Sequence, residues 1–140
     1  MKPEEVVSWR EALTRLSDQY FFDLMRMYLG PIKTPFNKQR LIDELSAFLR
    51  KKANRDRIML ALDGLDLLII AGIIELPSPT QQKIVTLLAP GASFPEVYNR
   101  ILNLEERLVL FRKDAEAGRA YAITPQLSDE FAALPTLSIL

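Results

Sequence analysis

Carboxylates that could perform chemistry occur in two close pairs, Asp63 with Asp66 and Glu105 with Glu106. Asp63 and Asp66 are three residues apart, so on a helix they share a face and could form an acid pair or hold a divalent ion. We favour a structural interpretation, in which they cap a helix near Gly64 or form an ion pair with a neighbouring arginine. Glu105 and Glu106 are adjacent, diverge on a helix and are typical of a solvated helix end.

Several classes of chemistry are excluded by composition. The 140-residue chain contains no cysteine and no histidine. Disulfide scaffolds, zinc fingers, thiol enzymes, serine-histidine-aspartate triads and histidine-ligated metal sites are therefore excluded within it. The chain also lacks the glycine-rich loop and lysine that cradle nucleotide phosphates, so we expect no ATP hydrolysis. We predict a protein without enzymatic activity, cofactor, metal or small-molecule substrate.

The charged residues balance overall but are unevenly distributed. Lys plus Arg and Asp plus Glu both number 18, which argues against a highly basic nucleic-acid-wrapping protein and an acidic disordered tail. Residues 33–57 nevertheless carry eight basic side chains against three acidic ones, and the remainder carries ten against fifteen. The densest block, residues 50–57, has two explanations of similar weight. One is compensation of helix dipoles at a solvated corner, and the other is a patch that contacts phosphates.

The elements that position these residues are mostly helices. Apolar residues recur at three- and four-residue steps through the first three quarters of the chain, which predicts a mainly α fold. We expect helices over residues 3–16, 18–29, 38–52, 55–76, 80–89 and 94–107. Asn54 and Ser78 are expected to cap the fourth and fifth helices, and Gly64 allows a kink or break in the fourth. Two short strands, Leu108–Phe111 and Tyr121–Thr124, then predict a hairpin around a charged loop.

Aromatic side chains crowd the helix predicted over residues 18–29 and recur in the helix over residues 94–107. In the first helix they are Tyr20, Phe21, Phe22 and Tyr28. Such residues could stack on unpaired bases, but at these spacings they are more often part of a core. We assign them to the core. We also assign Tyr98 to the core, because it belongs to the apolar stripe predicted for the helix over residues 94–107.

The order of elements predicts two units. Residues 54–134, with a helix, a short helix, a helix and a hairpin, resemble a winged helix, in which DNA-binding members place the third helix in the major groove. Residues 1–53 form a helical unit whose stretch from Lys38 to Leu45 resembles the SAP-type DNA-binding motif, with Asn37 where that motif prefers glycine. Residues 135–140 are an apolar tail, which we interpret as a sign that the chain is cut from a longer protein.

A more particular resemblance rests on five stretches of patterned residues. They are Arg15–Asp18, Leu62–Asp66, Pro79–Thr80, Leu104–Leu110 and Tyr121–Pro125. Together they look like the N-terminal domain of bacterial proteins related to XPB-type helicases, over about residues 12–134. This resemblance implies an accessory module, DNA-binding or protein-docking, within a larger DNA-associated protein.

The leading hypothesis is a non-enzymatic DNA-binding module of a helicase-related, transcription or repair protein, binding weakly or without sequence specificity. The expected contacts are Lys33, Lys38, Arg50, Lys51, Lys52, Arg55, Arg57, Asn99, Arg100, Asn103, Arg107, Arg112, Lys113 and Arg119. Glu96, Glu105 and Glu106 on the helix over residues 94–107 oppose a polyanion, which weakens the case for base reading by that helix. The alternative is a winged-helix protein-interaction module that docks a partner domain, including other domains of the same longer protein.

We expect neither membrane insertion nor export. The first residues lack the basic and apolar regions of a signal peptide. The most apolar window, Ile58–Leu76, contains Asp63, Asp66 and Glu75, and an aspartate at mid-span costs about 2.5–3.5 kcal/mol on insertion. We interpret this window as a buried helix and predict a cytoplasmic protein.

Overall fold

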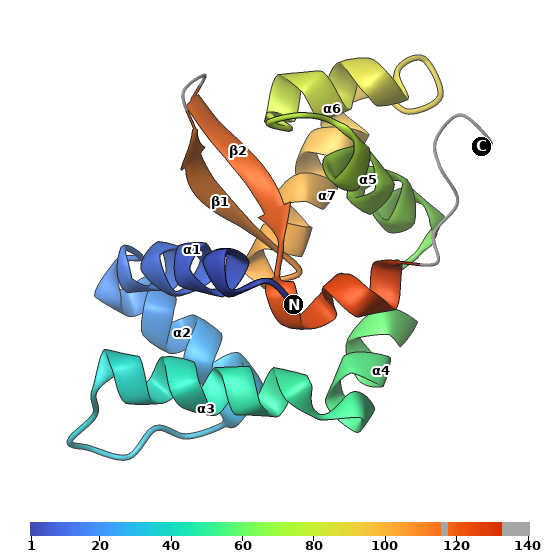
Figure 1. Cartoon of the computed structure of the whole chain (residues 1–140). Coiled ribbons are helices and arrows are strands. Elements are labelled where there is room, and N and C mark those ends of the chain that lie inside the picture. Colours follow the sequence, from blue (N-terminus) through green and yellow to red (C-terminus); the bar gives the residue numbers. More distant parts are fainter. Residues whose placement is uncertain (116–117, 133–140) are drawn as a thin grey trace.

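The computed structural model describes residues 1–115 and 118–132, which form a mainly α-helical fold with a small antiparallel hairpin (Figure 1). The predicted fold class is therefore confirmed. The helices are α1 (Pro3–Thr14), α2 (Asp18–Leu29), α3 (Lys38–Arg50), α4 (Lys52–Leu60), α5 (Gly64–Glu75), α6 (Gln81–Leu88), α7 (Phe94–Glu106) and the 3-10 helix η1 (Pro125–Phe131). The strands are β1 (Leu110–Ala115) and β2 (Gly118–Ile123).

Local sequence signals account for several helix ends. The Ser17 side chain accepts a hydrogen bond from Tyr20 N, and the Asn37 side chain accepts one from Arg40 N, so both residues cap the helices that follow them. Ser93 and Glu96 form the capping box expected at the start of α7. Gly30 ends α2 with a φ of 79°, a left-handed conformation that glycine adopts without strain.

The helix predicted over residues 55–76 is two helices, α4 and α5. The chain breaks at the predicted place because Asp63 and Asp66 form a capping box at the start of α5. Each carboxylate accepts a hydrogen bond from the backbone N–H of the other residue, at 3.0 Å. This reciprocal cap favours a new helix start over a continuous helix, and Gly64 becomes the first residue of α5.

Two predicted helix caps were wrong. Lys51 precedes α4, and the Asn54 side chain instead donates a hydrogen bond to the Phe48 carbonyl, at 2.8 Å. Thr80 rather than Ser78 caps α6, by accepting a hydrogen bond from Lys83 N at 3.3 Å. In both cases the helix begins at a different residue from the predicted one, so a neighbouring residue has the N-cap position.

The hairpin is longer than predicted because residues of the charged loop join its strands. Leu110 pairs with Ile123, and Arg112 pairs with Tyr121. The Tyr121 N–H donates to the Pro79 carbonyl at 2.8 Å, which fastens β2 to the turn before α6. The Thr124 hydroxyl donates to the Leu108 carbonyl and anchors the base of the hairpin.

The interior contains two hydrophobic clusters, with the hairpin between them (Figure 1). The N-terminal cluster contains Trp9, Leu13, Phe21, Leu24, Met25, Leu41, Ile42, Leu45, Leu49, Leu108 and Phe111. The C-terminal cluster contains Ile69, Ile70, Ile73, Ile84, Val97, Ile101, Leu104, Val109, Leu110, Tyr121, Leu127 and Phe131. Adjacent residues of a strand point to opposite faces, so Leu110 and Phe111 join different clusters.

The two clusters can be compared with the predicted units, residues 1–53 and 54–134. The N-terminal cluster is built mainly from α1–α3 but also uses the hairpin residues Leu108 and Phe111. The boundary between residues 53 and 54 remains a prediction, as do the winged-helix and SAP-type interpretations. The predicted tail, residues 135–140, lies outside the described residues.

The apolar window Ile58–Leu76 is divided between α4 and α5. Among the residues that the structure describes, no helix has both the length and the apolar character needed to span a membrane. The cytoplasmic location remains a prediction.

Candidate nucleic-acid interface

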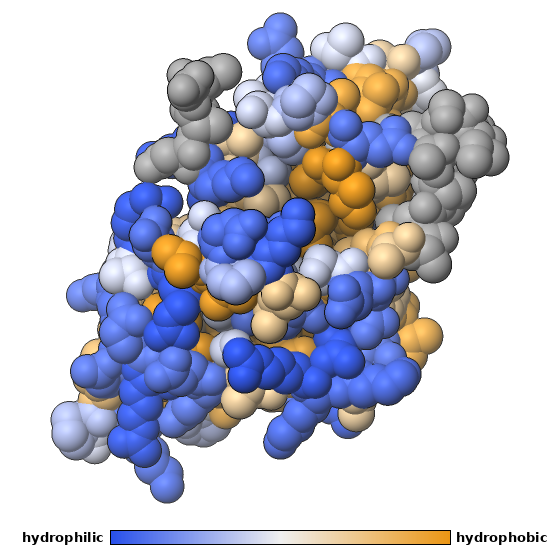
Figure 2. All heavy atoms as spheres, viewed as in Figure 1, coloured by the Kyte–Doolittle hydropathy of each residue, from blue (hydrophilic) through white to orange (hydrophobic). Residues whose placement is uncertain are grey.

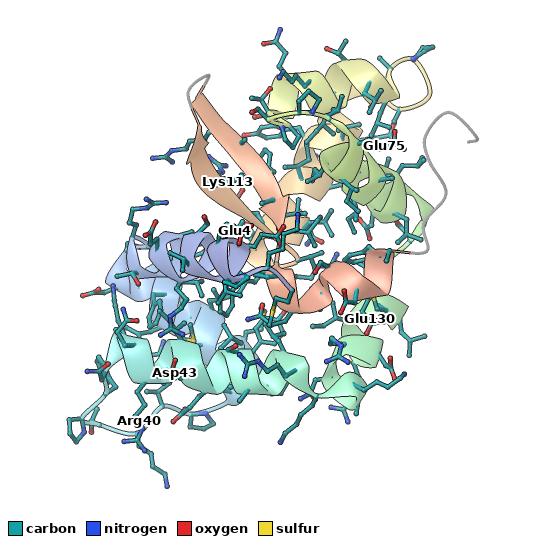
Figure 3. The ribbon with its side chains drawn as sticks, in the orientation of Figure 1. Glu4, Arg40, Asp43, Glu75, Lys113 and Glu130 are labelled. Atoms are coloured by element: carbon teal, nitrogen blue, oxygen red, sulfur yellow. The ribbon has the colours of Figure 1, made fainter. Side chains whose placement is uncertain are left out.

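The fourteen predicted contact residues are distributed over four regions (Figures 1 and 3). Lys33 precedes α3 and Lys38 begins it, whereas the block at residues 50–57 lies beyond its other end. A 13-residue helix is about 20 Å long, which separates these two regions. The remaining contacts are on α7 and on the hairpin. They therefore do not converge on one surface.

Lys38 is mainly a structural residue. Its Nζ lies 2.9 Å from Asp18 Oδ1 and 5.1 Å from the centre of the Phe21 ring. These contacts fasten the start of α3 to α2. Lys33 is exposed and has no ion pair within residues 1–115 and 118–132.

The corner between α3 and α4 begins with a well-capped C-terminus. The Asn54 side chain donates to the Phe48 carbonyl, and Arg55 Nη1 donates to the carbonyls of Leu49, at 3.2 Å, and Arg50. Arg55 Nε also forms an ion pair with Glu130 of η1 at 2.9 Å. The carbonyls that form the negative end of α3 are thus satisfied by two side chains of α4.

The start of α4 differs from the capped end of α3. Lys51 holds the cap position, and in the described part of the chain no side chain caps α4. Arg50, Lys51 and Arg57 are exposed and form no ion pair with any described residue. Lys52 pairs with Asp56 at 3.0 Å, but an exposed pair four residues apart on a helix is worth only about 0.3–0.5 kcal/mol. We call Arg50, Lys51, Lys52, Arg55 and Arg57 the basic corner.

The charged face of α7 is turned toward the start of α5. Arg100 Nη1 lies 3.2 Å from Asp66 Oδ1 and also hydrogen-bonds to Asp63. Arg107 Nη2 lies 3.7 Å from Asp66 Oδ2. The Arg100 hydrogen bond lowers the pKa of Asp63 below its ordinary value. The structural interpretation of the two aspartates is therefore confirmed, and these arginines are engaged within the protein.

The other two predicted contacts on α7 are uncharged amide side chains. Asn99 and Asn103 are exposed beside Arg100 and Arg107. Among the described residues, no group of three carboxylates, histidines or cysteines could hold a metal ion.

The hairpin carries both engaged and available cations. Arg112 Nε forms an ion pair with Glu105 Oε2 at 2.9 Å, and its guanidinium lies 5.5 Å from the centre of the Tyr121 ring. Burial raises the pKa of Tyr121. Lys113 and Arg119 are exposed, and neither has an ion pair with a residue whose side chain the structure describes, a set that leaves out residues 114–118.

An exposed aromatic pair on α7 was missed by sequence reasoning. Phe94 and Tyr98 are 55% and 37% exposed, and their rings stack with centroids 5.8 Å apart and planes 17° apart. Tyr98 was assigned to the core, whereas the buried side of α7 consists of Val97, Ile101 and Leu104. The spacing of four residues was the available signal, because it places two rings on one face of a helix.

Phe94 lines an open groove of about 800 Å³ between α6, the start of α7 and the hairpin, which we call the aromatic groove. Its other lining residues include Gln81, Gln82, Arg112, Arg119 and Tyr121.

The aromatic residues of α2 are more internal. Phe21 is fully buried, and the Tyr28 hydroxyl donates a hydrogen bond to the Arg107 carbonyl. Burial raises the pKa of Tyr28 to about 12. Phe22 is partly buried against the N-terminal cluster, and Tyr20 is 37% exposed. The core assignment therefore describes Phe21 well and Tyr20 poorly.

Comparison with known proteins gives one partial match. The family model TP_0021_N, described as an N-terminal domain, matches residues 1–50, a segment that ends with α3. Its description specifies neither a ligand nor an activity. Neither a curated protein nor a solved structure matches the chain.

Proposed function

We propose that this protein is a non-enzymatic DNA-binding module of a larger helicase-related, transcription or repair protein, and that the basic corner supplies its phosphate contacts. The observation that carries this proposal is the start of α4, which no described side chain caps and which has exposed Arg50 and Lys51 beside it, with exposed Arg57 in the last turn of the same helix. It replaces the broader interface of fourteen residues with one local surface.

The electrostatics of the corner favour an anion. A helix N-terminus carries the equivalent of about half a positive charge, and its free amide groups bind phosphates well. The opposing negative end of α3 is neutralised by Asn54 and Arg55. Because the Lys52–Asp56 pair is exposed and weak, Lys52 can also turn to a phosphate at little cost.

The same geometry supports weak binding without sequence preference. Arg100 and Arg107, which were the candidates for reading bases from α7, are held by Asp66. Phosphate contacts position a protein on DNA without reading its sequence. A few such contacts correspond to a Kd of roughly 10⁻⁴ to 10⁻⁶ M at physiological salt.

A salt titration of duplex binding tests this proposal. Fluorescence anisotropy of a short labelled duplex should give an affinity that falls as salt rises, with a log–log slope of about −0.9 for each neutralised phosphate. The variant Arg50→Ala/Lys51→Ala/Arg57→Ala should flatten this slope. A matched control, Lys2→Ala/Arg26→Ala/Arg40→Ala, removes the same number of exposed cations elsewhere and should leave it unchanged. Equal slopes for the two variants would contradict the assignment of the surface.

A second candidate function, docking of a partner protein, is favoured by an apolar groove of about 510 Å³ between α1, α5, the hairpin and η1. Its lining includes Ile73, Ile74, Phe111 and Phe131, and Ile74 is 53% exposed. Figure 2 shows hydrophobic surface beside the hairpin over α5. Absence of duplex binding at low salt would favour this function over DNA binding.

A further inference from the structure

We propose that the aromatic groove binds single-stranded nucleic acid, with an unpaired base stacked on Phe94. This site goes beyond the proposed function, because it takes a different ligand in a different place. The basic corner lies between α3 and α4, whereas the groove lies between α6, α7 and the hairpin (Figure 1). Either site can therefore exist without the other.

Phe94 provides the stacking surface. More than half of its side chain is exposed, although burying a phenylalanine ring is worth about 1.5–3 kcal/mol. Tyr98 stacks against it from the next turn of α7, which restricts the orientation of the Phe94 ring. An aromatic ring held in this way is a sequence-tolerant platform, because every base has a flat face.

The polar residues of the groove match the rest of a nucleotide. Arg119 is exposed, and its guanidinium can pair with a phosphate through two parallel hydrogen bonds. Gln81 and Gln82 present amide groups, which can both donate to and accept from base edges. Of the two arginines among the described lining residues, Arg112 is paired with Glu105, so Arg119 is the one that can meet a phosphate.

The walls of the groove are joined by contacts across the fold. Tyr121 N–H donates to the Pro79 carbonyl at 2.8 Å and connects β2 to the turn before α6. Arg112 joins β1 to α7 through its ion pair with Glu105. The Ser93–Glu96 capping box fixes the first turn of α7, where Phe94 lies. A site prepared in this way loses less entropy when its ligand binds.

Lys113 lies outside this groove. It is on the strand next to Arg112, so it points to the opposite face of the hairpin. There it lines the apolar groove together with Glu4 (Figure 3). Arg119 is therefore the exposed cation to test in the aromatic groove.

The test is the binding of a fluorescein-labelled oligothymidine at low salt, followed by anisotropy as salt rises. Phe94→Leu keeps an apolar side chain but removes the ring, and it should weaken binding about tenfold without changing the salt slope. Arg119→Gln should weaken binding and reduce the magnitude of the slope by about 0.7, the value for one phosphate of a single strand. This division between affinity and salt slope separates stacking from phosphate contact.

Two control variants complete the design. Phe36→Leu changes a phenylalanine that is 49% exposed on another part of the surface and should leave binding unchanged. Arg50→Ala/Lys51→Ala/Arg57→Ala should weaken duplex binding by a larger factor than oligothymidine binding, and Phe94→Leu should do the reverse, so the two sites can fail separately.

The proposal is overturned if Phe94→Leu and Arg119→Gln bind oligothymidine as the unmodified protein does. It is also overturned if a proline-rich peptide binds the groove and oligothymidine does not. Unchanged thermal unfolding of each variant verifies that differences in binding do not come from loss of the fold.

Discussion

Arg100 of α7 and Asp66 of α5 form an ion pair at 3.2 Å, and the Asp66 side chain is only 4% exposed. Asp66 also accepts the backbone N–H of Asp63 and lies 3.7 Å from Arg107. The buried Asp66 carboxylate thus completes the capping box at the start of α5 and joins this helix to α7. This relationship explains why Arg100 and Arg107 are engaged with α5, whereas Asn99 and Asn103 of the same helix remain exposed.

Removal of this carboxylate should destabilise the protein. We expect Asp66→Ala to lower the free energy of unfolding by about 2 kcal/mol, because a helix cap and charge-assisted hydrogen bonds are lost together. Asp66→Asn keeps an oxygen that can cap α5 but removes the charge, so its loss should be smaller. Urea unfolding followed by circular dichroism measures both values. Equal losses for the two variants would show that the ion pairs contribute most of the effect.

The lowered pKa of Asp63 predicts that the stability of the fold depends on pH. Its pKa lies below the ordinary value of 3.8 because Arg100 donates a hydrogen bond to the carboxylate. The folded state therefore binds this proton less tightly than the unfolded state. The resulting stabilisation is present above pH 3.8 and is lost as the pH falls through the lowered pKa. Melting temperatures of the protein and of Asp63→Asn should differ at neutral pH and converge in acid. A constant difference across this range would contradict the assignment.

The raised pKa of Tyr28 predicts a second dependence of stability on pH, in alkaline solution. Burial raises its pKa to about 12, from an ordinary value of 10.0, so the folded state holds the phenol proton more tightly. This contribution to stability is present below pH 10 and is lost as the pH rises toward 12. Absorbance of tyrosinate should show a component near pH 12 that disappears in Tyr28→Phe. The substitution also removes a hydrogen bond to Arg107 and should cost about 1 kcal/mol.

The hairpin should make the two hydrophobic clusters unfold together. Trp9 is the one tryptophan of the chain, and it is fully buried in the N-terminal cluster. Its fluorescence and the far-ultraviolet circular dichroism should give the same urea midpoint, because Leu110 and Phe111 connect both clusters through one strand. Phe111→Ala should lower stability by about 3 kcal/mol and shift both signals. A Trp9 transition at lower urea would instead support a separate unit at residues 1–53.

The sequence by itself determined much of the local structure. The caps at Ser17, Asn37 and Ser93 were predictable because their hydrogen bonds join residues three positions apart. The apolar stripes of the helices and the hairpin followed from periodicity for a similar reason. The basic corner was also visible in the sequence, since its residues are close neighbours in the chain.

The tertiary structure decided which charged and aromatic residues remain available for binding. Lys38 contacts Asp18, Arg55 contacts Glu130, and Arg100 contacts Asp66, over separations of 20 to 75 residues. Such pairs depend on how helices pack against one another, which their individual apolar stripes do not specify. The exposure of Phe94 has the same origin, because an aromatic residue at the edge of a helix is covered only if another element packs there.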